Sequence, residues 1–170
     1  MTAAVFVDTN VFVYARDASE PAKRAVAIQW LEELWREHRG RTSAQVLSEY
    51  YVTVTGKLRR PLEREVAWGH VRDLMAWEPQ DISCELLRLA REIEQRYATS
   101  WWDAMIVAAA QLQDCAILLS EDFQDGMVFG GVAVRNPFAA RVAEQNVEYA
   151  VPRMAVARHR PRGRPRAAAR

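Results

Sequence analysis

The chain has 170 residues, of which half are hydrophobic and 26% are charged. This is the composition of an ordinary globular protein, and the length fits one compact domain. No apolar run reaches the length of a membrane span, and the short apolar N-terminus has no basic leader. We therefore expect a cytoplasmic protein without a secretory signal or a membrane segment.

The charge is unevenly distributed. The chain has 23 basic and 22 acidic residues, for a net charge of +1, but residues 151–170 contain seven arginines and no acid. Residues 1–150 therefore carry a net charge of −6, which does not suit a protein that binds nucleic acid by charge alone. We expect a folded domain over residues 1–150 and a disordered Arg/Pro/Ala-rich tail over residues 151–170, which either adds salt-sensitive RNA affinity or is inert.

The cysteines and histidines exclude a structural zinc site. Cys84 and Cys115 form no CxxC pair, and the three histidines have no partner at ligand spacing. We expect both cysteines to be buried, reduced thiols.

The predicted elements alternate short apolar strands with helices. Strands are expected over residues 3–7, 116–119 and 132–134, because each is a short apolar run bounded by polar or turn residues. A helical pattern follows Asp8, and apolar periodicity predicts further helices over residues 20–38, 42–58, 62–77, 83–97 and 101–113. This alternation predicts an α/β fold, a three-layer α/β/α sandwich around a short, mainly parallel sheet.

Two acidic residues follow predicted strands directly. Asp8 comes after the first strand, and Asp122 comes just after the strand at 116–119. Sites in parallel α/β sheets form at the carboxyl ends of the strands, so neighbouring strands would bring these acids together. Like charges at close range repel and raise each other's pKa, and a divalent cation relieves the repulsion. Ligands that are all oxygen favour Mg²⁺ or Mn²⁺.

Each acid also has a purely structural interpretation. Asp8 is placed to cap the helix that follows it, and Asp103 completes a capping-box spacing after Ser100. Asp125 precedes a glycine in a turn, and Glu49 lies on the polar face of its helix. Spacing alone therefore leads to an α/β domain with a possible site for a hard metal ion.

Five segments in order add a family resemblance. The chain resembles the PIN-domain family, and in particular the VapC-type toxin ribonucleases of bacterial type II toxin–antitoxin systems. The similarity covers roughly residues 3–138. It rests on VFVDTN at 5–10, QVLSEYYVTVTGKL at 45–58, WWDAMIVAAA at 101–110, LLSEDFQDG at 118–126 and VRNPF at 134–138.

The resemblance implies a PIN-like fold with four catalytic, metal-binding carboxylates: Asp8, Glu49, Asp103 and Asp122. It gives Asp125 a supporting place among the metal ligands, because that position aligns with a more variable one. Asp122 and Asp125 fit the pattern about equally well as the closer ligand. The resemblance also implies a set of polar residues that line the same pocket, namely Thr9, Asn10 and Ser120, with Glu121 directed outward.

The activity implied is that of a metal-dependent endoribonuclease that hydrolyses RNA with Mg²⁺, or alternatively Mn²⁺. Glu49 either binds a second ion or accepts the proton of the attacking water. The partners implied are an RNA substrate, a cognate antitoxin and a second copy of the chain. A basic cluster at Lys57, Arg59, Arg60 and Arg64 either guides the RNA or is an ordinary solvated surface, and Trp101 and Trp102 are candidates for base stacking.

Two other function classes share parts of this pattern. A haloacid-dehalogenase-type phosphohydrolase needs a second Asp two residues after the first, where this chain has Asn10, and a Lys near the last acidic turn, which is absent between residues 114 and 130. A non-catalytic PIN-like interaction or scaffold domain remains the alternative. It predicts that replacing Asp103 by Asn leaves function intact and that metal does not change the melting temperature.

Overall fold

The computed structural model describes residues 3–139. The expected domain boundary at residue 150 and the expected basic tail over residues 151–170 lie outside the described residues.

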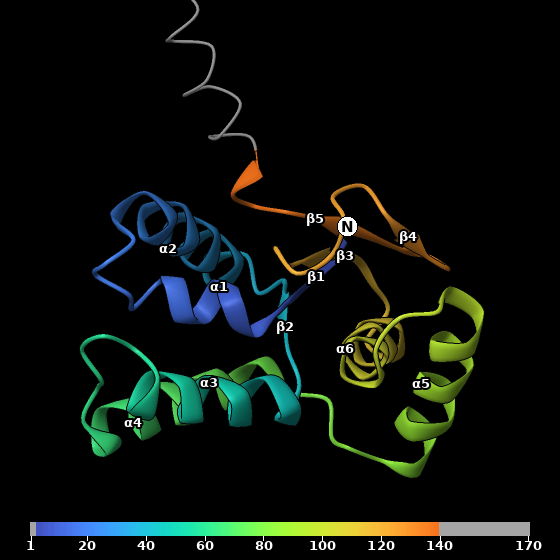
Figure 1. The fold of residues 1–170 in the computed structure, drawn as a ribbon, viewed down its shortest axis with the longest axis horizontal. Coiled ribbons are helices and arrows are strands. Elements are labelled where there is room, and N and C mark those ends of the chain that lie inside the picture. Colours follow the sequence, from blue (N-terminus) through green and yellow to red (C-terminus); the bar gives the residue numbers. More distant parts are fainter. Residues whose placement is uncertain (1–2, 140–170) are drawn as a thin grey trace, which may run out of the picture.

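In the described part of the chain, the sheet has five strands in the order β2-β1-β3-β5-β4 (Figure 1). All neighbouring pairs are parallel except β4 with β5. The mainly parallel sheet expected from the sequence is therefore confirmed. The strands are β1 (Ala4–Val7), β2 (Gly40–Arg41), β3 (Cys115–Leu119), β4 (Val128–Phe129) and β5 (Val132–Arg135).

Within residues 3–139, six α-helices occupy the regions where the sequence predicted helices. Several begin at a serine whose hydroxyl accepts a hydrogen bond from the backbone three residues on: Ser43, Ser83 and Ser100 each cap one helix in this way. The helices are α1 (Thr9–Tyr14), α2 (Pro21–Arg36), α3 (Ala44–Gly56), α4 (Arg64–Leu74), α5 (Cys84–Tyr97) and α6 (Trp101–Leu112), with a 3₁₀ turn at Met75–Trp77 after α4.

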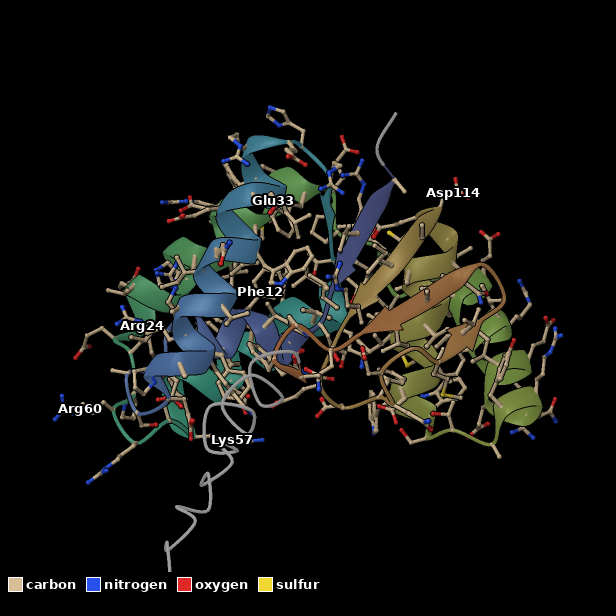
Figure 2. The ribbon with its side chains drawn as sticks, turned by 90° about the horizontal axis from the view of Figure 1, so that it is seen from above. Phe12, Arg24, Glu33, Lys57, Arg60 and Asp114 are labelled. Carbon is tan, nitrogen blue, oxygen red and sulfur yellow. The ribbon has the colours of Figure 1, made fainter. Side chains whose placement is uncertain are left out.

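The helices flank the strands on two sides. Helices α1 and α2 lie on one side and α5 and α6 on the other, while α3 packs against both α1 and α4 (Figures 1 and 2). The side chain of Phe6 on β1 is fully buried, and so is that of Leu118 on β3, and residues 104–110 of α6 are buried throughout. The α/β fold with helices on both faces of a short sheet is thus confirmed.

The topology brings the carboxyl ends of β1 and β3 side by side. Val7 pairs with Leu119 in the parallel ladder, and the backbone N–H of Asp8 donates to the carbonyl of Leu119 at 3.0 Å. The next strand in sequence after β1, β2, lies on the opposite side of β1 from β3. The chain order therefore reverses at β1, and a crevice at such a reversal is where α/β sheets place their sites.

Neither a membrane span nor a disulfide is found among residues 3–139. No helix there is long and apolar enough to cross a bilayer. Cys115 is a buried free thiol, as expected, but Cys84 is exposed, so the expectation of two buried thiols is wrong for Cys84. Cys84 is the first residue of α5, whose buried side is formed by Leu86, Ala90 and Ile93.

Gly40 is a position where the packing requires a glycine. A Cβ atom at Gly40 would overlap the indole ring of Trp77, which is itself buried. We expect Gly40→Ala to lower the free energy of unfolding by about 1–3 kcal/mol through overpacking. Urea denaturation measures the change. The matched control is Gly69→Ala on α4, where a Cβ meets nothing within 4 Å and where alanine favours the helix. Equal stability of the two variants would contradict the prediction.

Candidate active site

Asp8 is the buried centre of the site. Its side chain caps α1, because Oδ1 accepts a hydrogen bond from the Thr9 N–H at 2.6 Å. Its other oxygen, Oδ2, accepts from the Ser120 hydroxyl, also at 2.6 Å. Asp8 is only 5% exposed, and Ser120 is fully buried. The end of β1 and the end of β3 are therefore joined through a carboxylate and a hydroxyl.

Asn10 brings Asp122 to this centre. Its Nδ2 lies 3.1 Å from Asp122 Oδ2 and 3.2 Å from Ser120 Oγ. The Asp122 N–H donates to the same Ser120 hydroxyl at 3.1 Å, which fixes the turn after β3. Asn10 Oδ1 is buried and has no hydrogen-bond partner among residues 3–139. An unsatisfied oxygen beside two carboxylates is a feature that a bound cation or its water would satisfy.

Glu49 joins the site from α3. Thr9 donates its hydroxyl to Glu49 Oε2 at 3.2 Å, and Gln45 donates its amide to Oε1 at 2.9 Å. Gln45 is also 3.5 Å from the carbonyl oxygen of Trp102, at the start of α6. Glu49 is exposed, yet its orientation is set by residues from two helices.

Asp103 stands at the edge of this group. It lies in the first turn of α6, where its N–H donates to the Ser100 hydroxyl at 3.2 Å, so the predicted helix cap is present. Its carboxylate forms no hydrogen bond or ion pair within the described part of the chain, and Asp103 is half-buried. It directly follows Trp102, whose carbonyl contacts the Gln45 that orients Glu49. The start of α6 therefore adjoins the site.

Two other acids of the last turn have different partners. The Asp125 carboxylate accepts the Asn136 N–H at 2.7 Å and so ties its loop to the end of β5. Glu121 forms an ion pair with Lys23 of α2 at 2.6 Å rather than joining Asp8 and Asp122. That leaves Asp122 as the acid of this turn that contacts the Asp8 group.

Sequence reasoning missed Gln45 and Lys23. Gln45 could have been found, because it precedes Glu49 by four residues and therefore lies on the same face of its helix. Nothing in the sequence links Lys23 to Glu121, because the two residues meet only through the packing of α2 beside the sheet.

The electrostatics of Asp8 reflect its burial. Burial raises the pKa of Asp8 from its ordinary 3.8 to about 7; the hydrogen bonds from Ser120 and Thr9 lower it, and the charges of Asp122 and Glu49 raise it further. The carboxylate of Asp8 therefore interacts electrostatically with those of Asp122 and Glu49. A positive ion at this place would favour the ionised form of Asp8.

The residues fit a hard divalent cation by donor type. The donors are carboxylate, amide and hydroxyl oxygens, which suit Mg²⁺ and Mn²⁺. Within residues 3–139, no three acid, histidine or cysteine side chains converge closely enough to form a finished metal cage. Glu49 and Asp122 are exposed, and their hydrogen bonds leave carboxylate lone pairs open to an ion that Asp8 would hold.

The sequence of this chain matches a known protein family. Residues 5–124 match the family model of the PIN domain. The chain belongs to the PIN-domain family. The resemblance seen in the sequence is thereby confirmed, and the matched span contains all four of the expected carboxylates.

This PIN domain also matches a solved structure. The crystal structure of the toxin VapC20 of Mycobacterium tuberculosis, described as cleaving the sarcin-ricin loop, superposes with a TM-score of 0.50 at 18% sequence identity. The match covers 68% of this chain and 87% of VapC20, so the two proteins share a fold. No curated protein matches the chain significantly in sequence.

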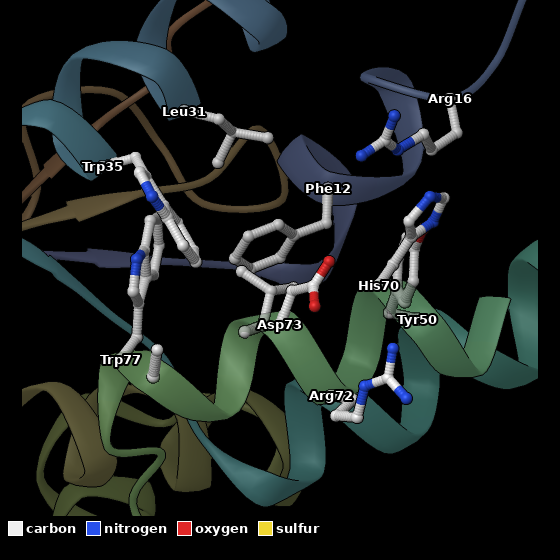
Figure 3. A pocket seen from close by; sticks show the side chains of 11 residues that line it. Phe12, Arg16, Leu31, Trp35, Tyr50, His70, Arg72, Asp73 and Trp77 are labelled. Carbon is white, nitrogen blue, oxygen red and sulfur yellow. The ribbon is translucent and has the colours of Figure 1, made fainter. Parts of the chain in front are cut away.

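One cavity of this PIN domain lies apart from the carboxylates. It has a volume of about 590 Å³ and lies between α1, α2, α3 and the end of α4 (Figure 3). Phe12, Trp35 and Trp77 form its apolar part, and the hydroxyl of Tyr50 is 2.8 Å from His70 Nδ1 at the other end. None of the four expected catalytic carboxylates lines it.

The raised pKa of Asp8 makes the metal-free PIN domain sensitive to pH. Between pH 3.8 and about 7 the folded protein keeps a proton on Asp8 that the unfolded chain has lost. The free energy of unfolding therefore falls as the pH rises through this window, by at most about 1.4 kcal/mol per pH unit, and levels off above it. We expect this slope in EDTA and a larger Mg²⁺-induced rise in melting temperature at pH 8 than at pH 5.

Thermal denaturation of the wild type and of Asp8→Asn between pH 4 and 8 measures the effect. The variant lacks the titrating group, so the difference in stability between the two proteins isolates Asp8 from every other carboxylate. A difference that stays constant between pH 5 and 7 would contradict the prediction.

Proposed function

We propose that this PIN domain is a metal-dependent endoribonuclease, the toxin of a toxin–antitoxin pair. One observation carries the proposal. Asp8 is buried where β1 and β3 end, and it lies within the electrostatic influence of Asp122 and Glu49. Keeping a buried carboxylate within electrostatic range of two others is costly unless a cation binds among them.

The fold supports an RNA substrate. VapC20, which has the same fold, is described as a toxin that cleaves the sarcin-ricin loop. The sequence resemblance to VapC-type toxins covers every segment that supplies an acid to the site. We assign RNA hydrolysis to this chain on those two grounds.

The carboxylates and Ser120 have distinct roles in the proposed reaction. Asp8, Asp103 and Asp122 would hold Mg²⁺ or Mn²⁺, with Asp125 in a supporting place. A bound ion of this kind lowers the pKa of water and neutralises charge on the phosphate. Ser120 holds Asp8 and the Asp122 backbone in place.

Glu49 has the freedom to act as a base. Thr9 and Gln45 each donate one hydrogen bond to it, one to each carboxylate oxygen, and leave further lone pairs open. Glu49 would therefore accept the proton of the attacking water or bind a second ion, and its exposure gives the substrate access.

The proposal includes partners. A cognate antitoxin would neutralise the exposed carboxylates, and an arginine paired with Asp122 or Glu49 is the physically simplest inhibitor. A homodimer and a cytoplasmic location complete the proposal. Light scattering at micromolar concentration tests the dimer, and a monomer would contradict that part alone.

The non-catalytic scaffold domain is not favoured. A protein that only binds partners gains nothing from burying a carboxylate beside two others, because the repulsion destabilises the fold. All four acids of the family pattern are also present in this chain.

The test is cleavage of a mixed pool of structured RNAs by purified full-length protein in Mg²⁺, Mn²⁺ or EDTA. We expect discrete cuts that require metal. Asp8→Asn prepared in parallel must lose them, since equal cutting by the variant identifies a contaminating nuclease. No cutting by the wild type, together with no metal-dependent rise in melting temperature, would refute the proposal.

A further inference from the structure

A groove extends from the candidate active site along α3. It has a volume of about 520 Å³, and both Thr9 and Glu49 contribute to its lining. The site and the groove are therefore continuous. Lys57 also lines the groove, eight residues after Glu49. At the rise of an α-helix this separation corresponds to about 12 Å along α3.

The groove contains three exposed apolar side chains from three separate segments. Val52 belongs to α3, Ile82 precedes α5, and Trp102 belongs to the first turn of α6; they are 56%, 53% and 62% exposed. Single exposed apolar residues are ordinary, but three that line one groove form a surface suited to an apolar or aromatic ligand.

Lys57 supplies a positive charge in the same groove. It is the C-cap residue of α3, projects at the surface (Figure 2) and forms no ion pair within residues 3–139. The lining thus combines an exposed indole, a cation and the proposed metal-binding carboxylate Glu49. An RNA strand offers a matching set of groups: flat bases, and phosphates that need a cation.

We propose that this groove binds the unpaired nucleotides of a single-stranded RNA segment beside the cleavage site, with a base stacked on Trp102 and a phosphate at Lys57. The proposal rests on the proposed function and names the form of its substrate. At the spacing of stacked nucleotides, 12 Å corresponds to about three residues of one strand. Paired bases are stacked inside their helix and offer no free face to Trp102, so the groove favours a loop or an end over a duplex.

The backbone of Trp102 lies beside the residues that orient Glu49. Its backbone carbonyl lies 3.5 Å from the amide of Gln45, the residue that also holds Glu49. Trp102 directly precedes Asp103, one of the four expected catalytic carboxylates. A base on this indole would therefore place the adjoining phosphodiester next to the carboxylates, which is where hydrolysis requires it.

Binding to a labelled single-stranded oligoribonucleotide of mixed sequence tests the proposal. The full chain carries Asp8→Asn, so that the probe is not cut, and fluorescence anisotropy is recorded at fixed salt. We expect Trp102→Ala to weaken binding by about 5- to 100-fold, the usual range for loss of one stacked base, and Trp102→Phe to restore most of it. Lys57→Gln should weaken binding and reduce its salt dependence.

Two matched controls lie outside the groove. Trp68→Ala removes a 48% exposed tryptophan of α4, and Arg88→Gln removes an exposed cation of α5. Neither should change the affinity. In proteins that retain Asp8, the metal-induced rise in melting temperature should be unchanged by each of these substitutions at Trp102, Lys57, Trp68 and Arg88, because none of them replaces a proposed ligand.

Three outcomes would overturn the inference: equal affinity of Trp102→Ala and Trp68→Ala, tighter binding of a duplex than of the single strand, or a change of Trp102→Ala in oligomeric state without a change in RNA affinity. The last would make the groove a contact between protein chains. In each case metal-dependent RNA cleavage by the wild type would still stand, so the proposed function is tested separately.

Discussion

Asp8→Asn is expected to lower kcat/KM for metal-dependent RNA cleavage by at least about 10²-fold. Asp8 is the one buried carboxylate of the site, and it touches the ends of both β1 and β3. An asparagine keeps the size and an acceptor oxygen for the Thr9 N–H, but it has no charge with which to hold a cation. The loss should therefore appear in metal affinity as well as in turnover.

The same substitution should not destabilise the metal-free protein. At pH 8 the buried Asp8 is ionised above its pKa of about 7, next to Asp122 and Glu49, so its charge opposes folding. We expect Asp8→Asn in EDTA to unfold at the same temperature as the wild type or higher. Loss of activity with retained or raised stability is typical of a functional residue whose ionised side chain lowers the free energy of unfolding.

Asp114→Asn is the matched control. Asp114 is exposed and has a φ of 52°, a backbone conformation that asparagine adopts readily. The Asp114→Asn variant should therefore cleave RNA like the wild type. Unchanged metal affinity in Asp8→Asn would remove Asp8 from the proposed metal ligands, and an Asp8→Asn protein that melts well below the wild type in EDTA at pH 8 would contradict the electrostatic argument.

Ser120→Ala is expected to weaken metal binding by about 10- to 100-fold although Ser120 is not a proposed ligand. Its hydroxyl donates to Asp8 Oδ2 and accepts the Asp122 N–H, and it lies 3.2 Å from Asn10 Nδ2. Alanine removes all three contacts inside a fully buried position. Loss of such an outer hydrogen bond commonly costs one to two powers of ten in metal affinity.

Isothermal titration with Mn²⁺ measures the change, and RNA cleavage at raised metal concentration shows whether saturation rescues activity. Recovery at high metal concentration is expected, because the ligands themselves remain. Ser19→Ala is the control, since the exposed Ser19 hydroxyl bonds only to the nearby Asp17 among residues 3–139. Unchanged Mn²⁺ affinity in Ser120→Ala would show that Asp8 and Asp122 hold their positions without this hydroxyl.

The sequence by itself determined the class of fold and the helices. Continuous apolar runs identified β1, β3 and β5, since a strand buried on both faces must be apolar along its length. Apolar periodicity of 3.6 residues located most of the helices to within a few residues, and the capping-box spacing at Ser100 marked the start of the last of them. The family resemblance, carried by four acid-bearing segments in order, identified a PIN domain before any contact was known.

Only the tertiary structure decided which acids meet. Strands β2 and β4 have two residues each, too few to show a pattern, and they exist because β1 and β5 offer them backbone partners. The burial of Asp8, the pairing of Glu121 with Lys23, and the groove from Glu49 to Lys57 depend on residues far apart in the chain. A local pattern reports which face of an element is apolar, whereas the neighbour that covers that face, and the charge it brings, is set by how the elements pack.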